Sequence, residues 1–340
     1  MQHFIDTQDF GKPELMDLLQ LIGLLKQADK QGALPPLLAG ASLGMIFEEP
    51  STRTRVSFEV AMTKLGGHAL YLKPGEIHLG QRENIKDTAQ VISRMVDAIE
   101  ARTLKHQTVL ALASNATVPI INGLTDYNHP TQVVCDVFTM LEHKLPEKNL
   151  EDLRVVFIGD ATNVCSSLLM LCTQLGMHFT HVAPVRYQAP EAWQRIGRDN
   201  CALSGGTLTI SDDPVAAIQH ADFIYTDLWW WVGQEAEIPE RRAAFMPRYQ
   251  ITTDLFMQAP LHAKMMHCLP ASRGVEATDE VLDHPRSIIY DQSENRLHTE
   301  KAILVKFIYP RLRRAPQALK QWHAGRIHAF LHDRALALPS

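Results

Sequence analysis

The chain has 340 residues, enough for one large or two ordinary domains, and its 33 basic and 38 acidic side chains give a formal net charge of −5. This mildly acidic balance argues against a nucleic-acid partner, and no stretch approaches the ~20 apolar residues of a membrane span. The five cysteines, without zinc-site spacing, and an N-terminus without a signal-peptide pattern predict a cytoplasmic protein with no metal site.

The first half of the chain alternates short apolar runs with segments of helical periodicity. This pattern predicts strands at 43–47, 68–72, 97–102 and 118–122, and helices at 13–29, 53–65, 85–95, 107–114 and 131–143. Strands that alternate with helices are typical of α/β domains, in which a mainly parallel sheet is flanked by helices.

The second half repeats this alternation and ends in helices. We predict strands at 153–158, 178–182, 208–210, 223–226, 264–267 and 287–290, and helices at 164–175, 294–309 and 317–336. A polar stretch at 144–149 is the best candidate for a domain boundary. The sequence therefore predicts two α/β domains, 1–146 and 147–310, followed by a C-terminal helical extension at 311–340.

The run Ser51-Thr52-Arg53-Thr54-Arg55 gathers anion-binding side chains at a turn between a predicted strand and a predicted helix. Ser51 or Thr52 lies near the N-cap, where free N–H groups and the helix dipole favour a negative ligand. Two arginines in the first turn oppose that dipole, and a bound polyanion explains their position. The alternative is a capped surface helix with two solvated arginines.

Further polar residues follow the carboxyl ends of other predicted strands, where open parallel sheets bind their ligands. Arg102 adds a second guanidinium for an anion at Arg53, unless it forms an inter-element salt bridge. His129, held by Pro130 at a helix mouth, tends to stay neutral and can donate to a carbonyl oxygen. Gln132 offers a donor and an acceptor to an amide-like group, although simple helix capping also explains this segment.

Two motifs in the second half resemble known catalytic signatures only in part. Gly159 is the single glycine in a turn where dinucleotide binding needs three, so we expect no nicotinamide cofactor. His267 and Cys268 are adjacent on a strand and point to opposite faces, which disfavours a thiol nucleophile with a histidine base. The turn at Pro270 instead exposes the carbonyls of Cys268 and Leu269 as acceptors for an –NH2 group.

Three successive tryptophans, Trp229, Trp230 and Trp231, follow another predicted strand. They cannot all face one side, so at least one lines a cleft or an interface. Asp227, which precedes them, lies beside this aromatic segment, and a carboxylate next to indole rings is a suitable site for an ammonium group.

Together these motifs resemble the aspartate/ornithine carbamoyltransferase superfamily over nearly the whole chain and in the expected order. The matching segments are Phe47 to Arg55, Ala101-Arg102, His129-Pro130-x-Gln132 and His267-Cys268-Leu269-Pro270. The last segment is characteristic of the ornithine-type branch. The resemblance implies the fold of that family, with the C-terminal helices packing back on the N-terminal domain, a carbamoyl phosphate-binding first domain and an amine-binding second domain.

The resemblance also implies a donor site for carbamoyl phosphate. Its residues would be Ser51, Thr52, Arg53, Thr54, His78, Arg102, His129, Gln132, Leu269 and Arg296. Thr54, Arg102, His129 and Cys268 are the predicted catalytic residues, with the first three around the carbonyl oxygen. His78 resembles the residue that reaches into a neighbouring subunit, which implies a homotrimer with shared active sites.

The acceptor site departs from the ornithine-specific pattern. Ornithine enzymes carry Ser-Met-Gly where this chain has Trp231-Val232-Gly233, and an indole cannot replace a serine acceptor for an α-ammonium group. Asn163 does match the contact to the ornithine carboxylate. The predicted amine-binding residues are Asn163, Asp227, Trp229, Trp230, Trp231, Cys268 and Pro270.

The amino-acid sequences of these motifs are most similar to those of the putrescine carbamoyltransferases. Those enzymes also carry an extra C-terminal helix that braces the trimer. Trp230-Trp231 nevertheless differs from the shorter, tyrosine-bearing loop of those enzymes. We therefore expect transfer of a carbamoyl group from carbamoyl phosphate to putrescine without a cofactor, or the reverse reaction in agmatine catabolism. An ornithine carbamoyltransferase and a non-catalytic ligand-binding homologue are the alternatives.

Overall fold

Two parallel sheets form the core of the computed structural model, which describes residues 2–77, 79, 83–231, 233–312 and 315–333. The first sheet has the order β2-β1-β3-β4 and the second the order β7-β6-β5-β8-β9. The strands are β1 (Ser42–Phe47), β2 (His68–Leu72), β3 (Ala98–Arg102), β4 (Ile120–Leu124), β5 (Arg154–Ile158), β6 (His178–Val182), β7 (Thr207–Ser211), β8 (Phe223–Thr226) and β9 (Lys264–His267).

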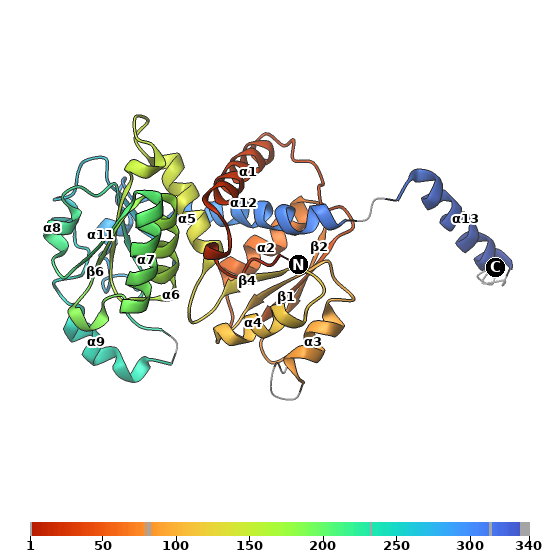
Figure 1. The fold of residues 1–340 in the computed structure, drawn as a ribbon, viewed down its shortest axis with the longest axis horizontal. Coiled ribbons are helices and arrows are strands. Elements are labelled where there is room, and N and C mark those ends of the chain that lie inside the picture. The colour runs from red at the N-terminus through yellow and green to blue at the C-terminus, as the bar shows by residue number, and fades with distance from the viewer. Residues whose placement is uncertain (1, 78, 80–82, 232, 313–314, 334–340) are drawn as a thin grey trace.

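Helices cover both faces of the first sheet (Figure 1). One face packs α3 and α4 through an apolar cluster that includes Ile99, Val109 and Ile120. The opposite face packs α2 and the returning helix α12 through a cluster that includes Met45, Phe58 and Ile303. The helices of this half are α1 (Lys12–Lys30), α2 (Thr52–Lys64), α3 (Ile85–Ile92), α4 (His106–Asn115) and α5 (Pro130–His143).

The second sheet is likewise covered on both faces. Phe157 and Phe179 join the α6 and α7 side, whereas Val156 and Ile224 belong to a separate cluster on the other face. The helices of this half are α6 (Asn163–Leu175), α7 (Glu191–Ser204), α8 (Pro214–Ile218), α9 (Ile238–Phe245), α10 (Thr253–Phe256) and α11 (Asp279–Leu282). Short 3₁₀ turns are η1 (Thr7–Asp9), η2 (Leu150–Asp152), η3 (Val185–Tyr187), η4 (Glu235–Glu237) and η5 (Tyr309–Arg311).

Two helices complete the described chain. Helix α12 (Ile289–Ile308) leaves the second sheet and packs against α1, α2 and α5 of the first half. Helix α13 (Gln317–Asp333) extends away from the body of the molecule (Figure 1). None of the described helices combines the length and the apolar character needed to cross a bilayer.

The predicted α/β fold is confirmed, and so is the return of a C-terminal helix to the first domain. The strand predicted at 287–290 is wrong, because Ser287 makes only an isolated bridge to Met265 and α12 starts at Ile289. The buried face of α12 carries polar residues such as Gln292, Asn295 and His298, so its apolar periodicity is weak at this end. Helix α7 and the short helices α8 to α11 were not predicted.

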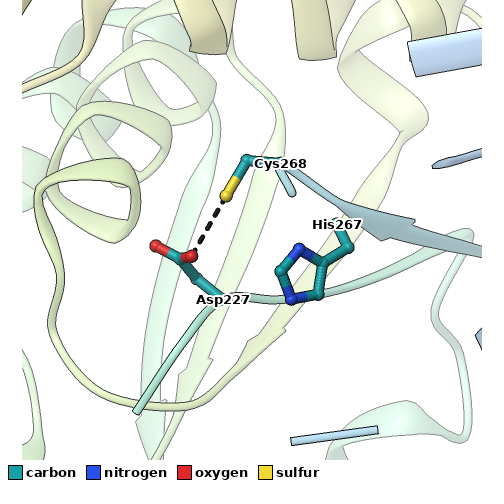
Figure 2. A group of neighbouring side chains, drawn as sticks. All are labelled: Asp227, His267 and Cys268. Atoms are coloured by element: carbon teal, nitrogen blue, oxygen red, sulfur yellow. Dashed lines mark hydrogen bonds between the residues drawn. The ribbon is translucent and has the colours of Figure 1, made fainter. Parts of the chain in front are cut away.

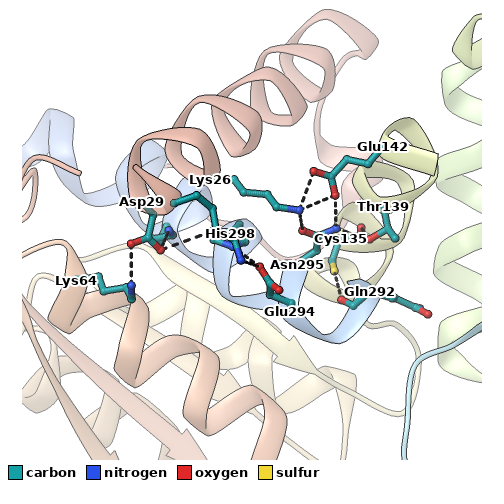
Figure 3. A network of polar contacts seen from close by, with 12 residues as sticks. Lys26, Asp29, Lys64, Cys135, Thr139, Glu142, Gln292, Glu294, Asn295 and His298 are labelled. Atoms are coloured by element: carbon teal, nitrogen blue, oxygen red, sulfur yellow. Dashed lines mark hydrogen bonds and ion pairs between the residues drawn. The ribbon is translucent and has the colours of Figure 1, made fainter. Parts of the chain in front are cut away.

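A buried ion pair and a polar network around it hold α12 on the first domain. Lys301 of α12 is fully buried and donates to Asp29 of α1 at 2.7 Å, and Lys64 of α2 donates to the same carboxylate at 2.7 Å. Lys26 of α1 bridges Glu142 and Asn295 at 2.7 and 2.8 Å (Figure 3). A buried ammonium without its carboxylate is strongly unfavourable, so these contacts fix the position of α12.

We predict that Asp29→Ala lowers the free energy of unfolding by about 3 kcal/mol, because it leaves Lys301 buried without its counter-ion. Urea unfolding followed by circular dichroism measures the change. Glu151→Ala is the matched control, since it breaks the exposed Lys12–Glu151 pair and should change stability by less than about 1 kcal/mol. Equal effects of the two variants would contradict the stabilising role of Asp29.

Candidate active site

A small cavity of about 80 Å³ lies between the carboxyl ends of strands from both sheets. It brings together most of the predicted site residues from both halves of the chain. Its lining residues are Ser51, Arg53, Thr54, Arg102, Leu124, His129, Gln132, Asn163, Val164, Asp227, Leu228, Trp231, Cys268, Leu269, Pro270 and Arg296. His78, the predicted inter-subunit residue, lies outside the described residues.

The N-terminus of α2 supplies the anion-binding edge of this cavity. Ser51 occupies the N-cap position without making a capping hydrogen bond, which leaves its hydroxyl available to a ligand. Thr54 is buried, and burial lowers the pKa of Arg53. Thr52 instead lines a separate groove against α12. Arg55 turns away, since it pairs with Glu59 at 3.0 Å.

Arg102 and Arg296 add two guanidinium groups to Arg53. Burial lowers the pKa of Arg102 to about 10, and the charges of Arg296 and Arg53 act in the same direction, whereas Glu100 opposes them. Arg102 therefore remains charged at neutral pH. Arg296 pairs with Glu300 at 2.8 Å, but Arg53 and Arg102 form no ion pair in the described part of the chain. An anionic ligand would supply the missing counter-charge.

His129 occupies the N-cap of α5, and its backbone N–H donates to the Ser167 hydroxyl at 2.8 Å. The ring is buried, and its Nδ1 has no hydrogen-bond partner among the residues that the structure describes. Burial lowers the pKa of His129 well below its usual value, and the neighbouring Arg296, Arg102 and Arg53 add to this effect. The imidazole is therefore neutral at physiological pH and can serve as a hydrogen-bond donor.

The turn after β9 is held by a buried histidine. The Leu269 N–H donates to His267 Nδ1 at 2.8 Å, so the ring proton lies on Nε2, which donates to Glu276 at 3.1 Å. Leu269 adopts a φ of 58°, a left-handed conformation that is unusual for leucine. This turn brings Cys268, Leu269 and Pro270 to the cavity wall.

Asp227 is a buried carboxylate that lines the same cavity as the arginines. Its oxygens accept from the Cys268 thiol at 3.1 Å, the Thr162 hydroxyl at 3.0 Å and the Leu228 N–H at 2.8 Å (Figure 2). All three donors are neutral, and Asp227 forms no ion pair among the described residues. Burial and the Asp227 charge raise the pKa of Cys268 well above its usual value, so no thiolate is available as a nucleophile.

Asp227, His267 and Cys268 place three possible metal-ligand atoms within 4.8 Å of one another. Both ring nitrogens of His267 are already engaged, however, by the Leu269 N–H and by Glu276. Figure 2 shows the imidazole beside the Cys268–Asp227 hydrogen bond rather than within it. A cation at this cluster would have to displace a buried hydrogen bond of the histidine.

The three tryptophans have different positions. Trp229 is fully buried and stacks on Phe245, with ring centroids 5.0 Å apart, so the predicted placement of this indole at the amine site is corrected. It lies in the apolar core of the second domain, whereas Trp231 lines the cavity. Trp230 lines an adjoining pocket, which also contains Asp160.

Sequence reasoning missed the buried acids behind the cavity. On α5, Asp136 accepts a hydrogen bond from Gln132, and on α12, Glu300 accepts one from Arg296. In each pair the two residues are four positions apart and share one helix face, and this spacing was the sequence signal that could have revealed them. The apolar lining residues Leu124, Val164 and Leu228 gave no signal, because core leucines and valines follow the same pattern.

Residues 2–142 match the family model of the carbamoyl-P binding domain of aspartate/ornithine carbamoyltransferases. Residues 151–307 match the model of their Asp/Orn binding domain. The chain belongs to the aspartate/ornithine carbamoyltransferase family. It is a carbamoyltransferase, as the similarity of the whole chain to curated enzymes also shows.

Relatives with two different acceptors are similar to this carbamoyltransferase. The putrescine carbamoyltransferase of Mycoplasma capricolum subsp. capricolum is 53% identical over 98% of this chain and 93% of its own. The anabolic ornithine carbamoyltransferase of Pyrococcus furiosus is 47% identical over 87% of this chain and 93% of its own. A solved structure of ornithine carbamoyltransferase from Pyrococcus furiosus has a TM-score of 0.87 and 44% identity, covering 92% and 98% of the two chains.

We predict that His129→Gln lowers kcat about 100-fold, because it displaces the hydrogen-bond donor that we expect at the carbonyl oxygen of carbamoyl phosphate. The ratio of wild-type to variant rates should stay constant between about pH 6 and 9, since the neutral ring and the amide do not titrate there. Taking this ratio removes the titration of the amine substrate. A ratio that falls as pH rises through about 6.5 would instead mean that the protonated imidazole is the active form.

Proposed function

We propose that this carbamoyltransferase uses carbamoyl phosphate and putrescine to form N-carbamoylputrescine and phosphate. The observation that carries the choice of acceptor is the polarity of the second-domain wall. Asp227 and Asn163 both present hydrogen-bond acceptors, and the lining residues from α6 and from the loops after β8 and β9 include no basic side chain, since Arg296 lies on α12 beside Gln132 of the first domain. A diamine supplies the matching donors, whereas the carboxylate of an amino acid does not.

The orientation of Asn163 follows from its partner. Its Nδ2 donates to the carbonyl oxygen of Thr125 at 2.7 Å, and a carbonyl oxygen can only accept. The Asn163 Oδ1 is therefore the other end of the amide, and it is buried with no hydrogen-bond partner in the described part of the chain. A buried unpaired acceptor favours an N–H donor and disfavours a carboxylate. This geometry supports putrescine over ornithine.

Asp227 is the proposed site for the ammonium group of the bound amine. It is a buried carboxylate with neutral donors only, so an ammonium would supply its counter-charge. The indole of Trp231 offers an apolar wall, with a π face suited to a cation, for the alkyl chain and the charged end. The Cys268 thiol then acts as a donor that orients Asp227.

On the donor side, we assign Ser51, Arg53 and Arg102 to the phosphate group, with Thr52 contributing through its backbone at the helix N-terminus. Thr54, Arg102 and His129 surround the carbonyl oxygen, where negative charge develops in the transition state. The carbamoyl nitrogen is assigned to two acceptors, the Gln132 side-chain oxygen and the Leu269 carbonyl. Arg296 lies behind this end of the ligand.

The amine attacks the carbonyl carbon as a neutral base, the C–N bond forms and the bond to phosphate oxygen breaks. The free amine has a pKa near ~10, and the neighbouring guanidinium groups lower it in the site. The departing phosphate accepts the proton that the amine nitrogen loses. The same geometry serves the reverse reaction, phosphorolysis of a carbamoylated amine.

Ornithine remains the second candidate acceptor. The Pyrococcus furiosus ornithine enzyme is 47% identical to this chain, although its similarity covers 87% of the chain against 98% for the putrescine enzyme. The additional coverage supports putrescine, because it extends the likeness over almost the whole chain.

We also propose a cytoplasmic homotrimer with shared active sites. The described cysteines are all unpaired, which suits a reducing compartment. Helix α13 exposes Trp322, Ile327 and Phe330, each more than half exposed. Such an apolar surface is typical of a subunit contact, and α13 is the proposed bracing helix of the trimer.

Incubation with carbamoyl phosphate and a panel of putrescine, ornithine and agmatine tests the proposed function. We expect phosphate release to be fastest with putrescine and to accompany N-carbamoylputrescine, detected by mass spectrometry. Faster turnover of ornithine would contradict the proposed acceptor. Asp227→Asn serves as the control for the acceptor site: it should raise the KM for the amine about tenfold and leave carbamoyl phosphate binding unchanged.

We predict that Trp231→Ser reduces the ratio of putrescine to ornithine turnover about tenfold, because it removes bulk from the acceptor wall and adds a hydroxyl acceptor. The kcat/KM values for the two amines measure this ratio. Trp230→Ser is the matched control, since Trp230 lines the adjoining pocket instead. An unchanged ratio in the Trp231 variant would mean that this indole does not select the acceptor.

A further inference from the structure

Behind the cavity, a fully buried carboxylate holds the side chain of Gln132. Asp136 lies one turn after Gln132 on α5. Its Oδ1 accepts from Gln132 Nε2 at 2.8 Å and from Gln292 Nε2 at 2.7 Å. Its Oδ2 accepts from the Tyr225 hydroxyl at 2.9 Å. These donors come from α5, α12 and β8, so Asp136 is fixed by both domains.

The partners of Gln132 determine which way its amide points. Arg296 Nη1 lies 2.7 Å from Gln132 Oε1, and a guanidinium can only donate. An ionised carboxylate can only accept, so Gln132 Nε2 must face Asp136. In the reverse orientation, the Gln132 –NH2 would face the Arg296 guanidinium, which is also a donor, and the Gln132 oxygen would face the Asp136 carboxylate, which is also an acceptor. The oxygen of Gln132 is therefore the end of the amide beside Arg296, a residue of the cavity wall.

Gln292 is oriented by the same logic. Its Oε1 accepts from the backbone N–H of His267 at 3.0 Å, so its Nε2 is the end that donates to Asp136. Burial raises the pKa of Asp136 to about 6, and the hydrogen bonds from Gln132, Gln292 and Tyr225 oppose that rise. Asp136 is therefore mainly ionised at neutral pH and acts as an acceptor for all three donors.

We infer that Asp136 is a positioning residue that binds the –NH2 of Gln132, so that only the oxygen of this amide, an acceptor, is available to a ligand. The site would thereby select a carbamoyl group over an acetyl group. A carbamoyl group ends in –NH2 and can donate to the Gln132 oxygen, whereas an acetyl group ends in a methyl and cannot. The inference rests on the proposed function, which assigns Gln132 to the carbamoyl nitrogen. Asp136 itself touches neither ligand, because Gln132 lies between them.

Two phosphonates test this selection without turnover. Phosphonoacetamide and acetonylphosphonate share a phosphonate and a carbonyl group and differ only in –NH2 against –CH3. We expect isothermal titration calorimetry to show that the wild-type protein binds phosphonoacetamide about tenfold more tightly than acetonylphosphonate. This difference corresponds to the contribution of roughly one hydrogen bond. In Asp136→Leu, which removes the acceptor for Gln132 Nε2, this preference should fall to about twofold or less.

Two further variants separate positioning from general disruption. Asp136→Asn should keep the preference, because its oxygen can accept from Gln132 while its –NH2 donates to the Tyr225 hydroxyl. Tyr225→Phe should also keep it, since it removes a different hydrogen bond to Asp136 and leaves the one to Gln132. Circular dichroism checks folding, and Asp136→Ser, whose hydroxyl is too short to reach the amide, replaces the leucine variant if that variant does not fold.

The outcomes distinguish this inference from the proposed function. A preference that survives in the folded leucine or serine variant overturns the positioning role, as does an equal loss of affinity for both probes. Equal wild-type affinity for the two probes overturns the selection by Gln132. Binding of neither probe to the wild-type protein overturns the proposed donor site itself.

Discussion

The hydrogen-bonded contact of Arg296 with Glu300 and Gln132 is the constraint on which the proposed donor site depends. It brings α12, which follows the second sheet in the chain, against α5 of the first domain. A guanidinium at this depth is tolerated only with a carboxylate and further acceptors around it. Because Arg296 needs the Gln132 oxygen and Asp136 needs the Gln132 nitrogen, the packing of α12 determines the chemistry that the cavity presents.

The charges around the donor site leave an excess of positive charge. Arg53, Arg102 and Arg296 face the buried acids Glu100 and Glu300, but burial and the charge of Glu300 raise the pKa of Glu100 well above its usual value. Burial raises the pKa of Glu300 as well, although its contact with Arg296 opposes that rise, and Glu300 is the carboxylate that pairs with Arg296. Arg53 and Arg102 form no ion pair among the described residues, so a phosphate group of about −2 would supply their counter-charge. A phosphate dianion at the proposed donor site would remove the repulsion between these guanidinium groups and an ammonium ion, so we expect carbamoyl phosphate to bind first.

Residue patterns predicted the strands of both sheets, apart from the wrong strand at 287–290, because buried parallel strands leave strong local signals. They also predicted that residues at the N-termini of α2 and α5 line one cavity. They could not predict that Trp229 enters the core, since neighbouring indoles in an irregular loop have no fixed period. The start of α12 was also hidden, because polar residues such as Gln292 and Asn295 replace apolar ones on its buried face. The orientation of Asn163 depends on Thr125, which is 38 positions away in the chain.

The two halves of the cavity differ in how firmly they are fixed. Gln292 binds both Asp136 and the backbone of His267, so α12 holds Gln132 on one side and the turn at Leu269 on the other. A change to any of these buried groups leaves another without its partner. At the proposed acceptor site Asp227 and Asn163 are buried and hydrogen-bonded as well, but Trp231 is a partly exposed loop residue whose side chain takes no part in those hydrogen bonds. A change of acceptor is therefore physically easier than a change of donor, which is consistent with relatives that act on putrescine and on ornithine.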